Sequence, residues 1–196
     1  MSPPTGPVKN ASVSTSILIV TGDAGESYEC LYARHRLLEA GMRPVIAAPS
    51  KRRLHLVIHD FEPGWDTYVE RPGYKLSADL TFKDVKVADY AAVILLGGRA
   101  PEYLRNDATL LQLVRDFAEG GRFVFSICHG IQILVAAGLA EGRKLTCYEH
   151  VKSEVTSAGG EWIGQESVRD GKFVSAQTWI SHPDFYRHVI QCLEGH

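Results

Sequence analysis

The stretch S-I-C-H-G, residues 126–130, contains the side chains best suited to chemistry. It follows the apolar run F-V-F and precedes the helical pattern I-Q-I-L-V-A-A. A cysteine flanked by small residues between a strand and a helix has the form of a nucleophile elbow, with Cys128 in place of the usual serine. The helix N-terminus would favour a thiolate there. Strand, small residues, helix and the adjacent His129 together favour a reactive thiol over an inert core cysteine.

Two further groups have chemical potential. Gly97 and Gly98 end the apolar run A-A-V-I-L-L, and their N–H groups could hold an oxyanion beside the sulfur, although a simple turn explains them equally well. Glu26 opens a predicted helix, where a carboxylate commonly only stabilises the N-terminus. Its position after the first strand nevertheless points it toward Cys128. A carboxyl in a partly dry pocket has a raised pKa, which suits a proton shuttle.

The elements that must position these residues alternate between strand and helix. Strands are predicted at 16–21, 43–49, 91–98, 123–127 and 144–148, helices at 26–40, 107–119, 130–138, 150–158 and 183–194, and hairpins at 54–76 and 167–176. This order predicts an α/β fold with a mostly parallel sheet covered by helices on both faces. Ligands bind such sheets at the carboxyl ends of the strands. We therefore expect Asp23–Glu26, Gly97–Glu102 and Cys128–His129 to meet there.

The composition limits the classes of partner. The chain has 196 residues, 45% of them hydrophobic, with a formal net charge of -2. This balance gives no reason to expect binding to nucleic acid or to an anionic membrane. We predict a disordered tail over residues 1–15, without the apolar region of a secretory signal, and a single domain over 16–196.

The cysteines and histidines argue against a metal site. The four cysteines are scattered, which favours free thiols in a reducing compartment and predicts a cytoplasmic protein. His55 and His59 would chelate on one helix face, but the residues between them favour a strand, which separates them by roughly 13 Å. We expect neither a metal nor another cofactor.

Several motifs together resemble the ThiJ/PfpI superfamily over nearly all of the chain beyond the tail. They are G-D-A-G-E-S-Y-E, H-D-F-E-P-G-W-D-T-Y-V-E, G-G-R-A-P-E-Y-L, S-I-C-H-G-I-Q-I-L and A-G-G-E-W. The chain looks most similar to the PfpI-like branch and to plant proteins of the glyoxalase III type, which carry two such domains where this sequence has one. The resemblance implies a flavodoxin-like three-layer sandwich. It also implies Cys128 as nucleophile, Glu26 as its carboxyl partner, Gly98 as oxyanion donor and His129 as the adjacent histidine.

The resemblance also implies a shared site. In PfpI-like proteins the glutamate of G-G-R-A-P-E reaches the histidine of a neighbouring subunit, and Glu102 matches that glutamate. A homo-oligomer is therefore implied. The sequence departs from the family where the usual acidic pair is Glu26-Ser27, which leaves the local charge and the substrate open.

Three functions are compatible with these residues. The first is a glutathione-independent glyoxalase, which converts a small dicarbonyl such as methylglyoxal to lactate through a hemithioacetal on Cys128, with protein deglycation as a related activity. The second is a hydrolase, either a PfpI-type cysteine peptidase or an amidotransferase-like enzyme. The latter would need a distant histidine such as His182 of H-P-D, a motif that also suits a helix start. The third is a redox-sensing chaperone that works through oxidation of Cys128.

The side chains around Cys128 receive the following predictions. Because His129 is adjacent in the chain, we expect Glu102 to orient its ring rather than the ring to turn back onto the sulfur. This leaves Glu26 as the expected partner of Cys128. Arg99, His59 and Tyr68 are candidates for lining the pocket, although Arg99 could equally pair with Asp or Glu at an interface.

Overall fold

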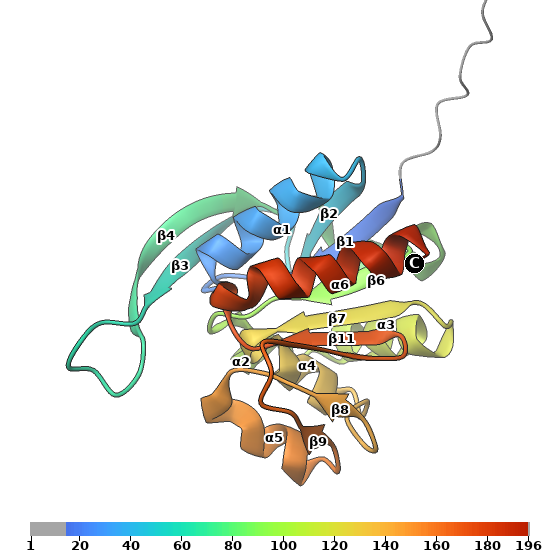
Figure 1. Cartoon of the computed structure of the whole chain (residues 1–196). Helices are drawn as coiled ribbons and strands as arrows, with labels where there is room; N and C mark the ends of the chain where they lie inside the picture. The colour runs from blue at the N-terminus through green and yellow to red at the C-terminus, as the bar shows by residue number, and fades with distance from the viewer. Residues whose placement is uncertain (1–14, 196) are drawn as a thin grey trace, which may run out of the picture.

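A seven-stranded sheet forms the centre of the molecule (Figure 1). The computed structural model describes residues 15–195. The strand order is β10-β11-β7-β6-β1-β2-β5, and only the β10–β11 pair is antiparallel. The strands are β1 (Ser16–Val20), β2 (Arg43–Ala48), β5 (Leu80–Thr81), β6 (Ala92–Leu95), β7 (Phe123–Ile127), β10 (Ser167–Asp170) and β11 (Phe173–Ala176).

Helices cover both faces of this sheet, because its central strands are apolar on both sides. In β1, Ile17 and Ile19 pack in one core and Leu18 and Val20 in the other. The first core includes α1 (Ser27–Glu39) and α6 (His182–Glu194); the second includes α3 (Ala108–Glu119), α4 (Ile131–Ala136) and α5 (Lys152–Ser157). The predicted α/β sandwich with a mostly parallel sheet is confirmed.

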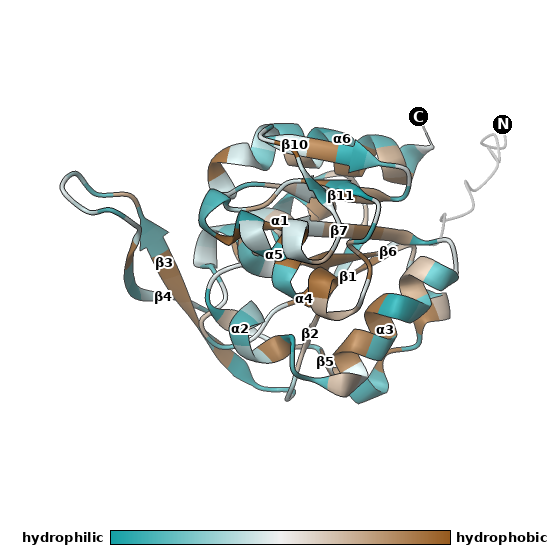
Figure 2. Ribbon diagram, turned by 90° about the horizontal axis from the view of Figure 1, so that it is seen from below, coloured by the Kyte–Doolittle hydropathy of each residue, from teal (hydrophilic) through white to brown (hydrophobic). Residues whose placement is uncertain are grey.

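A long hairpin extends away from this body and is called the arm below. It consists of β3 (Arg53–Asp60) and β4 (Val69–Ser77), which pair antiparallel (Figure 2). The predicted hairpin is therefore confirmed, although residues 65–68 belong to its loop rather than to its second strand. The arm joins the body next to α1, where Glu26 bridges to Val57.

The remaining elements are short. The predicted strand at 144–148 is reduced to β8 (Lys144–Leu145), which pairs with β9 (Glu161–Trp162) outside the main sheet. Helix α2 (Ala100–Leu104) directly follows the Gly97-Gly98 turn. Short 3₁₀ turns occupy Phe82–Asp84, Val87–Asp89, Cys128–Gly130, Glu149–Val151 and Trp179–Ser181.

Two sequence predictions concern the ends of the chain and the membrane. The predicted tail lies outside the described residues except for Thr15. Within the described part, no helix combines the length and the apolar character needed to cross a membrane.

Candidate active site

Cys128 occupies a strained turn at the carboxyl end of β7. Its φ is 57°, and Ala24 is the only other described non-glycine residue with a positive φ. This left-handed region disfavours side chains by about 1–2 kcal/mol, so it persists only where the surroundings enforce it. Gly130 completes the turn, because a Cβ there would lie 2.1 Å from the Leu95 carbonyl oxygen. The sheet edge thus holds the thiol in a fixed position.

Gly97 and Gly98 lie directly against the thiol. A Cβ on Gly97 would lie 2.6 Å from Cys128 Cβ, so the turn has room only for glycine. Gly98 has a φ of 76° and places its N–H toward the sulfur. The N–H of His129 also faces the sulfur. These donors are where an anion on sulfur or on a bound substrate would be stabilised.

The carboxyl in contact with Cys128 belongs to Glu29, a residue that the sequence analysis did not single out. It is fully buried in α1, and its Oε2 accepts the N–H of Gly97 at 2.7 Å. A hydrogen bond also joins its side chain to Cys128. Its spacing could have indicated it from the sequence, since Glu29 lies three residues after Glu26 and therefore on the same helix face.

Glu26 caps α1 rather than bonding the thiol. Its Oε2 accepts the N–H of Glu29 at 2.6 Å, and the N–H groups of Tyr28 and His59 also bond to it. The side chain is buried, and burial raises its pKa against these hydrogen bonds. It acts on Cys128 only through its charge. Its predicted role as the direct partner of the sulfur stays a prediction, whereas its capping role is visible in the geometry.

Burial and mutual charge couple the thiol to the carboxyl. The pKa of Glu29 is raised well above its ordinary value, first by burial and then by the charge of Glu26. Burial raises the pKa of Cys128 as well, and the charge of Glu29 adds to that rise. A proton on Glu29 removes this repulsion, so the protonation of Glu29 and the ionisation of Cys128 depend on each other.

His129 lies on the other side of the sulfur. Its Nδ1 is 3.3 Å from Cys128 Sγ, so the expectation that the ring would not turn back onto its neighbour was wrong. The left-handed backbone at Cys128 tightens the turn, so consecutive side chains meet instead of diverging. Burial, and secondarily His59, lowers the pKa of His129 to about 4. Its imidazole is therefore neutral near pH 7.

Residues of the arm extend the part of the site around the His129 ring, which is called the imidazole side below. Tyr68 meets the His129 ring edge-on with centroids 6.0 Å apart and stacks on His59 at 4.0 Å. His59 Nε2 lies 3.0 Å from Glu70, which also binds Arg99 through both carboxylate oxygens. Arg99 thus pairs with a carboxylate of its own chain, and the predicted pairing at an interface stays a prediction.

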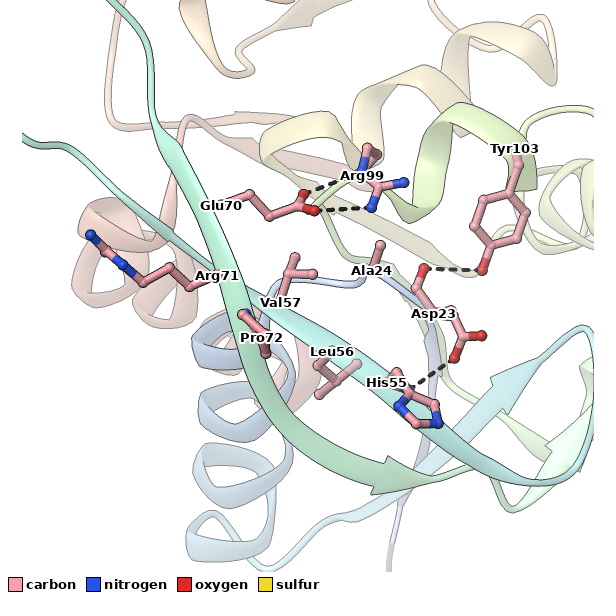
Figure 3. A pocket seen from close by; sticks show the side chains of 10 residues that line it. All are labelled: Asp23, Ala24, His55, Leu56, Val57, Glu70, Arg71, Pro72, Arg99 and Tyr103. Atoms are coloured by element: carbon pink, nitrogen blue, oxygen red, sulfur yellow. Dashed lines mark hydrogen bonds and ion pairs between the residues drawn. The ribbon is translucent and has the colours of Figure 1, made fainter. Parts of the chain in front are cut away.

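Two pockets flank the base of the arm. One has a volume of about 420 Å³ and includes Arg99 and Glu70 from opposite walls (Figure 3). The other has a volume of about 260 Å³ and lies against Glu26, His59 and Trp179. Cys128 is not among the described residues that line these two pockets, and only 6% of its surface is exposed.

Two predicted residues lie apart from the thiol. Glu102 lies in α2 with an exposed side chain, and no hydrogen bond joins it to His129 within residues 15–195. His182 begins α6 and packs against Tyr28, Tyr32 and Tyr186, again without a described bond to Cys128. The described residues also hold no group of three or more histidine, cysteine or acidic side chains that could bind a metal.

Comparisons with known proteins identify relatives over most of the chain. A family model described as the DJ-1/PfpI family matches residues 15–192. Protein DJ-1 homolog D of Arabidopsis thaliana is 36% identical over 94% of this chain and 49% of its own length, so the chain spans about half of that relative. Deglycase PH1704 of Pyrococcus horikoshii is 38% identical over 91% of this chain and 99% of its own length.

Solved structures agree on the fold. The ThiJ/PfpI domain protein of Brachyspira murdochii has a TM-score of 0.80 at 20% identity, covering 93% of this chain and 99% of that one. DJ-1beta of Drosophila melanogaster has a TM-score of 0.79 at 20% identity, covering 94% and 92%. The flavodoxin-like sandwich implied by the sequence is therefore confirmed.

Proposed function

The chain belongs to the DJ-1/PfpI family, and on that premise we propose that it is a cofactor-independent enzyme of the glyoxalase III type. Relatives named deglycases support action on carbonyl compounds. The observation that carries the proposal is a buried carboxyl, that of Glu29, bonded both to Cys128 and to the Gly97 N–H. Such a pair supplies a nucleophile and a proton shuttle at one point, which the conversion of methylglyoxal or glyoxal to a 2-hydroxy acid requires.

In the proposed reaction, the proton of the Cys128 thiol passes to the Glu29 carboxylate and from there to the carbonyl oxygen of the substrate, which leaves Glu29 ionised for the next step. The sulfur of Cys128 attacks the aldehyde carbon of methylglyoxal, and the carbonyl oxygen takes up a proton to give a hemithioacetal. The N–H of Gly98 stabilises the developing oxyanion. His129 is neutral and 3.3 Å from the sulfur, so it can accept the hydroxyl proton of the adduct.

Glu29 performs the central proton transfers. Its carboxylate removes the hydrogen from the hemithioacetal carbon while His129 passes the hydroxyl proton to the oxygen of the neighbouring carbon, which gives an enediolate. Glu29 then returns its proton to that neighbouring carbon, which gives a thioester with a 2-hydroxyl group. Hydrolysis of the thioester by water releases lactate and the Cys128 thiol, so methylglyoxal and water together balance lactic acid. Glu26 supports this step because its charge raises the pKa of Glu29.

We also propose that a second copy completes the imidazole side. The Glu102 carboxyl is exposed on α2. Burial raises the pKa of Tyr68 to about 12, and the charges of Cys128 and Glu102 add to that rise, so Glu102 lies near Tyr68. The arm that carries Tyr68 exposes large apolar side chains, including Phe61 and Trp65. A partner seated on this surface would bury them and could bring its own Glu102 to His129. Gel filtration with light scattering tests this, since a strict monomer removes Glu102 from the site.

The function is tested by measuring lactate formed from methylglyoxal without glutathione. Wild type should produce lactate, whereas Cys128→Ser and Glu29→Gln should lose nearly all turnover. Glu26→Gln is the matched control on the same helix face and should lose less, because it acts through Glu29. Equal lactate production by all four proteins would exclude the proposal.

A cysteine hydrolase is the second candidate, and the 3.3 Å approach of His129 Nδ1 to Cys128 Sγ favours it. A neutral histidine beside the thiol can act as its general base. The same variants separate the two functions, since a hydrolase that uses Cys128 and His129 should keep much of its peptidase activity in Glu29→Gln.

Protein deglycation uses the same chemistry as the proposed glyoxalase reaction and is measured on hemithioacetal adducts of a model thiol. The redox-sensing role stays a prediction.

A further inference from the structure

Three buried polar groups lie unpaired on the side of α1 that faces α6. Both ring nitrogens of His182, the hydroxyl of Tyr186 and Oε1 of Glu29 have no hydrogen-bond partner in the part of the chain that the structure describes. None of these side chains is more than 2% exposed. An unpaired buried polar group destabilises a fold by about 1–3 kcal/mol, so three of them in one region require an explanation.

Charge and ring contacts connect the three residues into a line at the α1–α6 interface. Burial raises the pKa of Tyr186, and the charge of Glu29 adds to that rise. The His182 ring lies 5.6 Å from that of Tyr186, and both contact the ring of Tyr32, the former stacked at 4.4 Å and the latter at 5.2 Å. The line begins at the carboxyl that contacts Cys128 and runs away from the thiol.

The outer end of this line reaches the surface. Tyr32 and Tyr28, which both contact His182, line a surface pocket of about 400 Å³. Tyr28 is 50% exposed. Tyr28 and Tyr32 therefore contact both the buried imidazole and this pocket.

Ordered water commonly satisfies such groups, with two to four hydrogen bonds for each molecule. We propose that His182, Tyr186 and Oε1 of Glu29 hold water between α1 and α6, and that this water exchanges the proton of Glu29 with solvent. The inference rests on the proposed glyoxalase function. It makes His182 and Tyr186 positioning residues, which act on substrate only through Glu29.

The exchange has a defined place in the reaction. When Glu29 removes the hydrogen from the hemithioacetal carbon, the bonding electrons form the enediolate and the proton rests on the carboxyl. The proton can then return to the neighbouring carbon or be replaced by a solvent proton through the water. No proton is gained or lost overall, and no oxidant or reductant takes part.

The test is to run the methylglyoxal reaction in D₂O and to measure deuterium at C2 of the lactate by NMR. Wild type should incorporate solvent deuterium, and Tyr186→Phe and His182→Phe should lower the incorporated fraction at least several-fold. Phenylalanine retains the aromatic packing in both variants. His188→Phe is the matched control, because His188 lies on the same helix but bonds to Ser167. It should leave the fraction unchanged.

The outcomes are distinguishable. If wild type forms no lactate, the proposed function fails and the exchange route fails with it. If wild type forms lactate that contains only the substrate hydrogen, or if both variants incorporate as much deuterium as wild type, the route is overturned while the function stands. A merely structural role would lower kcat without changing the deuterium fraction. A high-resolution structure with no water bonded to His182, Tyr186 or Glu29 would also overturn the route, independently of activity.

Discussion

The two sides of the Cys128 sulfur are formed by different parts of the molecule. On one side, Glu26 caps α1 and Glu29 lies within it. Backbone N–H groups of α1 and of Gly97 hold these carboxyls, and the N–H of His59 adds one further bond from the arm to Glu26. On the other side, the His129 ring packs against Tyr68, which the arm supplies. The acidic side is complete within one chain, whereas the imidazole side depends on a hairpin that extends away from the core.

This difference has an energetic basis. A two-stranded hairpin is marginally stable by itself, and this one exposes Trp65 to 62% and Tyr74 to 68%. The carboxyls are buried against the sheet, where small displacements meet a close-packed core. We therefore expect changes on the acidic side to alter chemistry directly, and changes in the arm to alter access and position.

The most severe expected effect is on the acidic side. Glu29→Gln removes the group that shuttles the proton, and a positioned acid-base group contributes roughly 10²–10⁴-fold to rate. We expect a loss of kcat in that range and a clearly smaller loss for Glu26→Gln. Steady-state lactate formation measures both. A larger loss for Glu26→Gln than for Glu29→Gln would return the role of direct partner to Glu26.

The two sides should also respond to pH with opposite sign. Burial lowers the folded-state pKa of His129 from 6.5 to about 4, so between these values the unfolded chain binds more protons and stability falls as the pH falls. The contribution is on the order of 3 kcal/mol. Burial raises the pKa of Glu29 above 4.5, so the folded state holds its proton more tightly and stability falls as the pH rises past that value.

Urea unfolding of two variants between pH 4 and pH 8 isolates these contributions. Relative to wild type, His129→Asn should gain stability as the pH falls from 6.5 toward 4, and Glu29→Gln should gain stability as the pH rises above 4.5. The exposed His35→Asn is the control for the histidine substitution. Parallel curves for the two variants would contradict the assignment of opposite shifts.

A third change acts on the turn between the two sides. A Cβ on Gly97 would lie 2.6 Å from Cys128 Cβ and 3.0 Å from Glu29 Oε2. Overpacking of this kind destabilises by about 1–3 kcal/mol, so we expect Gly97→Ala to lower the free energy of unfolding by that amount. It should also change the rate at which iodoacetamide alkylates Cys128. In Gly164→Ala the new Cβ meets only the far end of the Trp162 side chain, so neither quantity should change.

The sequence predicted the sheet, the elbow and the glycine turn because each depends on local patterns. Apolar runs, small residues around Cys128 and the Gly97-Gly98 pair fix backbone geometry within a few residues. The choice between Glu26 and Glu29 was beyond the sequence, since both lie on one helix face and only the packing of α1 on the sheet decides which reaches the sulfur. The approach of His129 to Cys128 likewise depends on the positive φ of Cys128. A cysteine gives no sign of such a backbone conformation in the sequence.

The smallest expected effect lies farthest out on the imidazole side. Arg99 binds Glu70, which in turn holds His59, but the Arg99 side chain is 51% exposed. Exposed ion pairs contribute about 0–1 kcal/mol, so Arg99→Ala should lower the free energy of unfolding by at most about 1 kcal/mol. Because Glu70 keeps His59, the stacking of Tyr68 should persist and kcat should fall only a few-fold. Arg187→Ala removes a comparable exposed pair on α6 and should leave kcat unchanged. A kcat loss for Arg99→Ala as large as that of Glu29→Gln would mean that the arm takes a direct part in the chemistry, and the contrast between the two sides would no longer hold.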